Sequence, residues 1–232
     1  FKNNTDSLGN TYGCHENFLM RRDVDFWKVT EQLIPFFVTR QIYSGAGKVL
    51  KVSGKPQYFI SQRAQHIHEK TSSSTTSSRS IINTRDEPHS DAERYRRLHI
   101  IVGDSNMSEF VTYLKVGTAT LVLSMIEEGY AVQGMEFEDP VKAIREVSRD
   151  PTLKRKIKLD DGRQMTAIEV QRVYLDRAQE YLAQQEHDPI LDDIWQRWAV
   201  VLDKLEEDPM QLVREIDWVT KRHLIQSYID KK

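Results

Sequence analysis

The spacing of apolar and polar positions divides the chain into a strand-rich first half and a helical second half. Polar turn residues at 3–10 precede residues 11–20, whose strand character predicts a strand that follows a hairpin turn. From residue 25 to 43 apolar positions recur every three or four residues, which predicts a helix that Pro35 kinks or divides. Glycines at 45–47 are expected to end it.

Short runs with strand character continue through the first half of the chain. They cover residues 48–52, 57–62, 79–84 and 95–102. The first two are expected to form a hairpin across residues 53–56. A run of Ser and Thr at 71–80 taken alone has the composition of a flexible linker, but the strand character that resumes at residue 79 argues against that interpretation. The polar residues 103–106 are expected to cap the N-terminus of a long helix at 107–128.

Helical spacing dominates after Gly129. The expected elements are a short helix at 140–147, a hairpin at 154–165 and three helices at 167–185, 189–205 and 209–228. Strands and helices do not alternate regularly, so the expected fold class is α+β.

Composition argues against several classes of partner and compartment. The 33 Lys and Arg residues nearly balance 35 Asp and Glu, so no nucleic-acid partner is expected. The most apolar runs, 33–38 and 119–126, are far shorter than the roughly 20 residues of a membrane span, so no membrane partner is expected. A single cysteine, Cys14, is typical of a protein of the reducing cytoplasm. The absence of an initiator Met leads us to expect a piece of a longer chain.

Candidate chemistry concentrates in two polar segments. On an extended segment His15 and Asn17 share one face, and Gly13 leaves space beside them. Both side chains can hydrogen-bond a phosphate or a carboxylate, and a purely structural pair is the alternative. Arg85 lies in the charged block 83–89 and offers a rigid fork for bidentate binding of an anion. A local ion-pair network at the end of a strand is the alternative interpretation.

His66 and His68 have the spacing of two metal ligands on one strand face. A catalytic zinc site needs a third ligand, and the sequence identifies none. A solvent-facing pair of histidines is therefore the favoured interpretation.

Longer strings resemble the family of Pup ligases and Pup deamidases, in which Pup is the prokaryotic ubiquitin-like protein. The strings are residues 9–17, 61–64, 81–89 and 95–109, and the likeness extends along the whole chain. Residues 71–80 and 103–109 resemble the ligases of the family rather than the depupylases.

The resemblance implies a fold similar to glutamine synthetase and other carboxylate-amine ligases. In that fold a curved antiparallel sheet holds ATP and magnesium, and helices cover its outer side. Residues 1–128 would be the β-rich part of the catalytic domain, without the N-terminal strands of the family. Residues 129–232 would be a mainly helical continuation of the same domain.

The implied activity is ATP-dependent ligation of the C-terminal glutamate of Pup to lysine side chains of target proteins. The reaction passes through a γ-glutamyl phosphate and marks the targets for proteasomal degradation in the cytoplasm. The implied cofactors are ATP and Mg²⁺, whose principal ligands are expected outside this chain, so the fragment alone is expected to be inactive. A depupylase that hydrolyses the amide, or a non-catalytic Pup-docking fragment, is the alternative.

The resemblance also implies roles for individual residues. His15 and Arg85 are the candidate catalytic residues, and Asn17 and Arg63 are candidate substrate- or phosphate-binding residues. His15 and Arg85 are expected to project from neighbouring strands into one hollow. No metal ligand is assigned within the chain, and Asp176 is not assigned as the base because its Tyr-x-Asp string falls in a helical segment.

Overall fold

The computed structural model describes residues 4–6, 8–74, 78–184 and 186–231. Parts of three sequence predictions, at residues 3, 7, 75–77 and 185, lie outside the described residues. The turn predicted near the start of the chain is present in its described part, since Thr5 and Thr11 form an antiparallel bridge.

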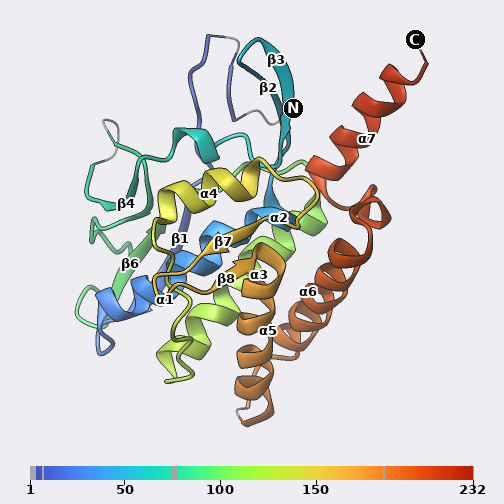
Figure 1. The fold of residues 1–232 in the computed structure, drawn as a ribbon. Coiled ribbons are helices and arrows are strands. Elements are labelled where there is room, and N and C mark those ends of the chain that lie inside the picture. Colours follow the sequence, from blue (N-terminus) through green and yellow to red (C-terminus); the bar gives the residue numbers. More distant parts are fainter. Residues whose placement is uncertain (1–3, 7, 75–77, 185, 232) are drawn as a thin grey trace.

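A four-stranded sheet lies at the centre of the first half (Figure 1). Its strands lie side by side in the order β1 (Glu16–Arg21), β6 (Tyr95–Ile100), β5 (Ser80–Asn83) and β4 (Glu69–Ser72). β6 pairs antiparallel with both β1 and β5. The α+β class is therefore confirmed.

The outer strand pair differs from the expected antiparallel sheet. β4 and β5 are parallel, because the chain returns to the start of β4 before β5 begins. The backbone N–H groups of His68 and Glu69 both donate to the carbonyl of Arg79, at 2.8 and 3.3 Å. The sheet is thus mixed at this edge.

One face of the sheet packs against helices. Met20, Leu98, Ile100 and Ile82 are buried on this face. Helix α1 (Phe26–Thr39) contacts β5, and helix α3 (Glu109–Glu127) contacts β1. Because side chains alternate along a strand, residues one position away point to the other face.

Helix α1 runs through Pro35 without a break and ends at Arg40, where the short helix α2 (Gln41–Ser44) begins. The Asp25 carboxylate caps α1 by accepting from the N–H groups of Trp27 and Lys28. Ten residues of α1 are buried, so packing holds the helix together although Pro35 cannot donate a backbone hydrogen bond.

The predicted hairpin is present as β2 (Lys48–Val52) and β3 (Lys55–Phe59), and it lies beside the N-terminal segment (Figure 1). Its turn is shorter than expected. Ser53 and Gly54 have φ angles of 50° and 80°, the left-handed conformation that two-residue hairpin loops require. The 3₁₀ turn η1 (Ala64–His66) follows.

Helix α3 begins two residues later than expected, because Ser108 rather than residues 103–106 provides its N-cap. The Ser108 hydroxyl accepts from the N–H of Val111 at 3.2 Å. Among the described residues, α3 alone is long and apolar enough to cross a membrane by length and composition. It packs against α1, α5 and α6, as a core helix does.

The second half is built mainly from helices. Its elements are α4 (Pro140–Ser148), β7 (Lys156–Lys158), β8 (Gln164–Thr166), α5 (Ala167–Gln184), α6 (Pro189–Glu207), η2 (Pro209–Leu212) and α7 (Asp217–Ile229). The helix predicted over residues 209–228 is therefore two elements. The Asp217 carboxylate accepts from the N–H groups of Met107 and Ser108, which fixes the start of α7 against the start of α3.

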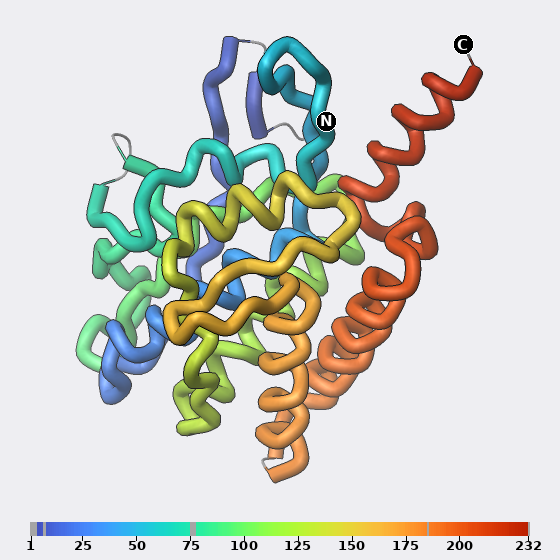
Figure 2. The backbone as a smooth tube through the Cα atoms, viewed as in Figure 1, coloured from blue at the N-terminus to red at the C-terminus, as the bar shows by residue number. Residues whose placement is uncertain are grey.

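A single hydrophobic core joins the two halves of the chain. It includes Met20 and Ile100 of the sheet together with Trp198 and Trp218 of the C-terminal helices. The Phe36 ring lies 5.9 Å from that of Trp198, in edge-on geometry. Figure 2 shows α5 and α6 running alongside each other and α7 extending away from this body.

Candidate functional site

The face of the sheet opposite the core carries a row of polar side chains. Asn17 of β1 lies opposite His99 of β6, and His99 lies opposite Asn83 of β5. His15 precedes Asn17 by two residues and Arg85 follows Asn83 by two, so the strand period puts them at the two ends of the same face. Strand β6 separates them, so the expectation of neighbouring strands is wrong.

His15 and His99 form a pair of imidazoles. Nδ1 of His15 lies 3.1 Å from Nε2 of His99, and the ring centroids are 4.9 Å apart. His99 is only 6% exposed, and burial together with the nearby Arg97 cation lowers its pKa to about 4. Burial and the cations of Arg63 and Arg97 also lower the pKa of His15. Both rings are therefore neutral near pH 7.

His99 is a residue that the sequence analysis missed. Residues 95–102 are predicted only as a strand, although Arg97 and His99 alternate with the buried Leu98 and Ile100. That alternation is the signal that places His99 on the polar face.

Arg63 is a buried cation without an anionic partner. It is 2% exposed, its Nε has no hydrogen-bond partner, and it forms no ion pair with any residue that the structure describes. Burial lowers its pKa, and the nearby Asp104 opposes that shift. The Asp104 carboxylate is itself occupied, since it accepts from the N–H groups of Ala46 and Gln62 and from the Ser61 hydroxyl.

Gly13 is the reason why Arg63 and His15 can approach each other. A β-carbon at this position would collide with Nη1 of Arg63 and would lie 2.7 Å from Nε2 of His15. The expected space beside His15 therefore exists, and the Arg63 side chain occupies it. A buried guanidinium that is not in an ion pair is unfavourable, so this is a place where an anion would be stabilised.

Arg85 lies at the far end of the polar face and is half-exposed. Its guanidinium donates to Glu87 at 2.5 Å, and Glu87 also lies 3.5 Å from Arg97. The local ion-pair network that was the alternative interpretation is thus present. The positive charges of Arg85 and Arg97 both lower the pKa of His99, so these two side chains also lie near the row of polar side chains.

Asn17 is exposed on the same face, and its side chain has no hydrogen-bond partner in the part of the chain that the structure describes. Its amide is available to a ligand. The four residues singled out from the sequence therefore fall on or beside one surface, with His15 and Arg63 in close contact and Arg85 more distant.

The remaining sequence candidates do not add a metal site. His66 ends the 3₁₀ turn η1 instead of lying on a strand, and His68 lies 3.5 Å from the Arg145 guanidinium. Among the described residues, no group of three or more His, Cys, Asp or Glu side chains could hold a metal ion. The cationic surface fits phosphate or carboxylate oxygens, and it does not fit Mg²⁺.

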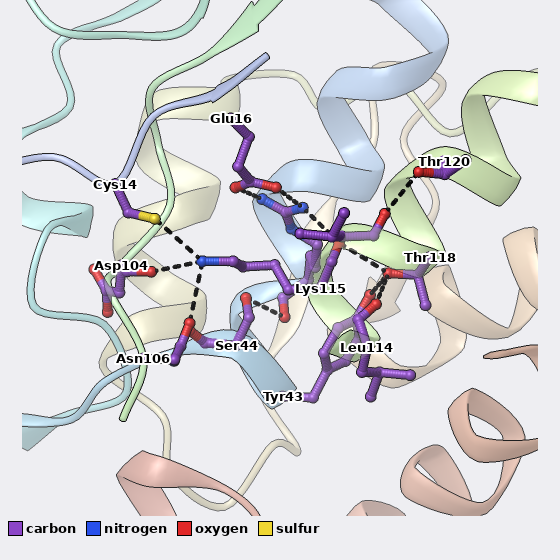
Figure 3. A network of polar contacts seen from close by, with 12 residues as sticks. Cys14, Glu16, Tyr43, Ser44, Asp104, Asn106, Leu114, Lys115, Thr118 and Thr120 are labelled. Atoms are coloured by element: carbon purple, nitrogen blue, oxygen red, sulfur yellow. Dashed lines mark hydrogen bonds and ion pairs between the residues drawn. The ribbon is translucent and has the colours of Figure 1, made fainter. Parts of the chain in front are cut away.

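A polar network beneath the site fixes the strand that carries His15 (Figure 3). Lys115 of α3 is 2% exposed, and its Nζ donates to the Asp104 carbonyl at 2.9 Å, to Asn106 Oδ1 at 3.2 Å and to Cys14 Sγ at 3.4 Å. The Glu16 carboxylate accepts two bonds from the Arg40 guanidinium, at 2.7 and 2.8 Å.

Comparison with known proteins gives matches along the whole chain. Residues 1–232 match the family model described as Pup-ligase protein. The chain is 55% identical over 232 residues to the Pup--protein ligase of Nocardia farcinica (strain IFM 10152), and 54% identical to that of Mycobacterium tuberculosis (strain ATCC 25177 / H37Ra). Each alignment covers 100% of this chain and 51% of the relative. The chain therefore spans about half the length of these curated relatives.

Two solved structures share the fold at a TM-score of 0.89 and 40% identity, over 100% of this chain. One is the Pup ligase PafA in complex with ADP, of which the chain covers 52%. The other is the complex between Pup and its ligase PafA, of which the chain covers 48%.

Proposed function

Because the chain belongs to the Pup-ligase protein family, we propose that it forms part of an ATP-dependent ligase that joins the C-terminal glutamate of Pup to lysine side chains of target proteins. The similar structures with ADP and with Pup support ATP as the phosphate donor and Pup as the partner. The product would mark the target for proteasomal degradation, and the site of action would be the cytoplasm.

The observation that carries this proposal is the buried, unpaired guanidinium of Arg63 beside His15. Activation of a carboxylate by ATP passes through a γ-glutamyl phosphate, and negative charge develops on its oxygens. Fixed donors in a site with little water stabilise such charge strongly. Arg63 supplies a cation there without a competing carboxylate, and Asn17 supplies an uncommitted amide.

We assign His15 as a hydrogen-bond donor to the anion and His99 as the residue that orients it. A buried N–H without an acceptor costs more than a buried lone pair without a donor, so the partnerless Nδ1 of His99 is the unprotonated nitrogen. Nε2 of His99 then donates to Nδ1 of His15. This leaves the N–H on Nε2 of His15, which lies beside Gly13 and Arg63, free to donate to a phosphate or carboxylate oxygen.

Arg85 is proposed as a second catalytic cation at the other end of the row. Its bond to Glu87 is half-exposed and therefore weak, so Arg85 can exchange that carboxylate for a substrate anion. Mg²⁺ would shield the phosphates of ATP. Its ligands and the catalytic base would come from the part of the relatives' length that this chain does not span, so we expect the chain alone to be inactive.

The single core supports the proposal that residues 1–128 and 129–232 are two parts of one catalytic domain. Met20 in the first part and Trp198 in the second belong to the same cluster of buried side chains. Neither part would bury its apolar surface alone.

Conjugation of Pup by the full-length protein tests the proposed function. Replacing Arg63→Gln or Arg85→Ala should lower the rate of conjugation by about 10²- to 10³-fold, since loss of a donor to a developing anion costs about 2.7–4 kcal/mol. The matched control is Arg197→Gln, which removes an exposed ion pair with Asp193 on α6. Wild-type rates in folded Arg63 and Arg85 variants would contradict the site. Release of Pup from a conjugate without any ligation would instead indicate amide hydrolysis.

A further inference from the structure

Cys14 and Lys115 lie at a distance from which a covalent bond can form. Nζ of Lys115 points at Sγ of Cys14 from 3.4 Å (Figure 3). Cys14 is only partly covered, so a small oxidant can reach the sulfur, whereas Lys115 is 2% exposed and is held in place by Asp104 and Asn106. The amine therefore cannot swing away from the sulfur.

The Lys115 ammonium group lies beside Cys14 and, among the residues that the structure describes, is not neutralised by an ion pair of its own. The other acceptors of Lys115 are a backbone carbonyl and an amide oxygen, both neutral, and Lys115 has no carboxylate partner within the described ranges. The Arg63 guanidinium is a second cation near Cys14.

Cys14 is the only cysteine in the chain. A cysteine sulfenic acid normally condenses with a second thiol or with a nitrogen. A second thiol of this chain is not available, and the Lys115 amine is the nitrogen that the structure holds against the sulfur.

We propose that Cys14 and Lys115 form an oxidation-dependent Sγ–Nζ cross-link when the protein meets hydrogen peroxide. The thiolate takes one oxygen from the peroxide, which breaks the O–O bond, and the other oxygen leaves as water after gaining a proton. The sulfur has then lost two electrons and is a sulfenic acid. The lone pair of Nζ forms the S–N bond, the sulfenic hydroxyl leaves as water with one proton from the nitrogen, and a further proton passes to solvent.

The cross-link would change the candidate site that contains His15 and Arg63. Cys14 lies between Gly13 and His15, and bond formation pulls its sulfur toward α3 from 3.4 Å. The His15 ring is held by His99 on the other face of the same segment, so the pull shifts the ring relative to Arg63. Oxidation therefore inactivates the ligase, and a thiol reductant restores it; this consequence depends on the proposed function, whereas the cross-link itself does not.

Peptide mapping of the full-length protein by mass spectrometry, before and after hydrogen peroxide, tests the proposal. We expect a peptide containing Cys14 joined to one containing Lys115, lighter than their sum by two hydrogen atoms and separated again by a thiol reductant. Cys14→Ser and Lys115→Met should each abolish the joined pair. Lys142→Met, a lysine on the surface of α4, should leave it intact.

Recovery of Cys14 only as sulfinic or sulfonic acid, or unmodified, would overturn the proposal. A reagent that traps sulfenic acids gives a second test, because the Lys115 amine should compete with it for Cys14. Equal labelling of Cys14 in the wild-type protein and in Lys115→Met would also overturn the proposal. If Lys115→Met does not fold, the proposal is tested by comparing the peptide maps of the wild-type protein and of Cys14→Ser. Since the map does not use conjugation as its readout, its result stands even if the proposed activity fails.

Discussion

At the scale of single residues, the ion pair of Glu16 with Arg40 shows how strongly the strand is anchored below the site. The side chains are 6% and 1% exposed, and both carboxylate oxygens are bonded. Arg40 also donates to the Lys115 carbonyl at 3.1 Å, so the pair links β1, α1 and α3. Removing one partner leaves the other as an uncompensated buried charge.

Glu16→Gln should therefore destabilise the protein by about 3–5 kcal/mol, as breaking a buried ion pair does. Chemical denaturation measures the change. The control is Glu128→Gln, which breaks an exposed pair with Arg21 and should cost no more than about 1 kcal/mol. Equal effects of the two substitutions would show that the buried pair does not hold the strand.

His99 makes stability depend on pH in a defined window. In the unfolded chain the ring gains a proton below its ordinary pKa of 6.5, but in the folded protein its pKa is about 4. The unfolded state binds more protons between these values, so this contribution to stability is complete above pH 6.5 and is lost as the pH falls toward 4. The lowered pKa of His15 acts in the same direction.

Melting temperature as a function of pH measures this dependence. His99→Asn should melt at a temperature that falls less steeply than that of the wild-type protein between about pH 6.5 and 4. His223→Asn, on the exposed side of α7, should follow the wild-type curve. A variant of His99 that keeps the full slope would show that other groups carry the acid sensitivity.

At the scale of elements, Gly117 shows tertiary packing overriding helix propensity. By propensity alone, glycine inside α3 costs about 1 kcal/mol relative to alanine. A β-carbon at Gly117 would lie 2.5 Å from Cδ1 and 2.7 Å from Cγ1 of Ile194, which is buried. The glycine therefore lets α6 approach α3 closely.

Gly117→Ala should destabilise the protein by about 1–3 kcal/mol, the usual cost of overpacking, instead of stabilising it. Combined with Ile194→Ala, it should cost less than the sum of the two single substitutions, because the two changes share one contact. Unfolding free energies of the single and double variants test this coupling. Thr120→Ala on the exposed side of α3 is the control and should change stability little.

The limits of sequence prediction also appear at this scale. The period of apolar residues predicted α1, α3, α5, α6 and both hairpins, because packing on one side leaves a periodic trace. It missed the break between η2 and α7, and it placed the cap of α3 too early. Asp217 bonds the start of α3 from 109 and 110 residues away, and local patterns do not report such contacts.

At the scale of the whole molecule, the candidate site is assembled from segments that are far apart in the sequence. The period of a strand was enough to predict that His15 and Asn17 share a face, and both residues lie next to His99. The burial of Arg63 could not be predicted, because it depends on Gly13 and Asp104, which reach it only in the folded chain. The pairing of His99 with His15 likewise depends on β6 lying beside β1.

The two-faced sheet has a consequence for how this protein tolerates variation. Even-numbered positions of β1 and β6, such as Met20, Leu98 and Ile100, face the helices, and odd-numbered ones, such as Asn17 and His99, face the site. Every position of both strands can be substituted and scored once for cellular abundance and once for the proposed Pup conjugation. We expect the two scores to alternate along the strands in opposite phase. Two scores that rise and fall together would mean that folding and chemistry share the same positions. Opposite phases would mean that selection can alter the reaction on one face while the other continues to specify the fold.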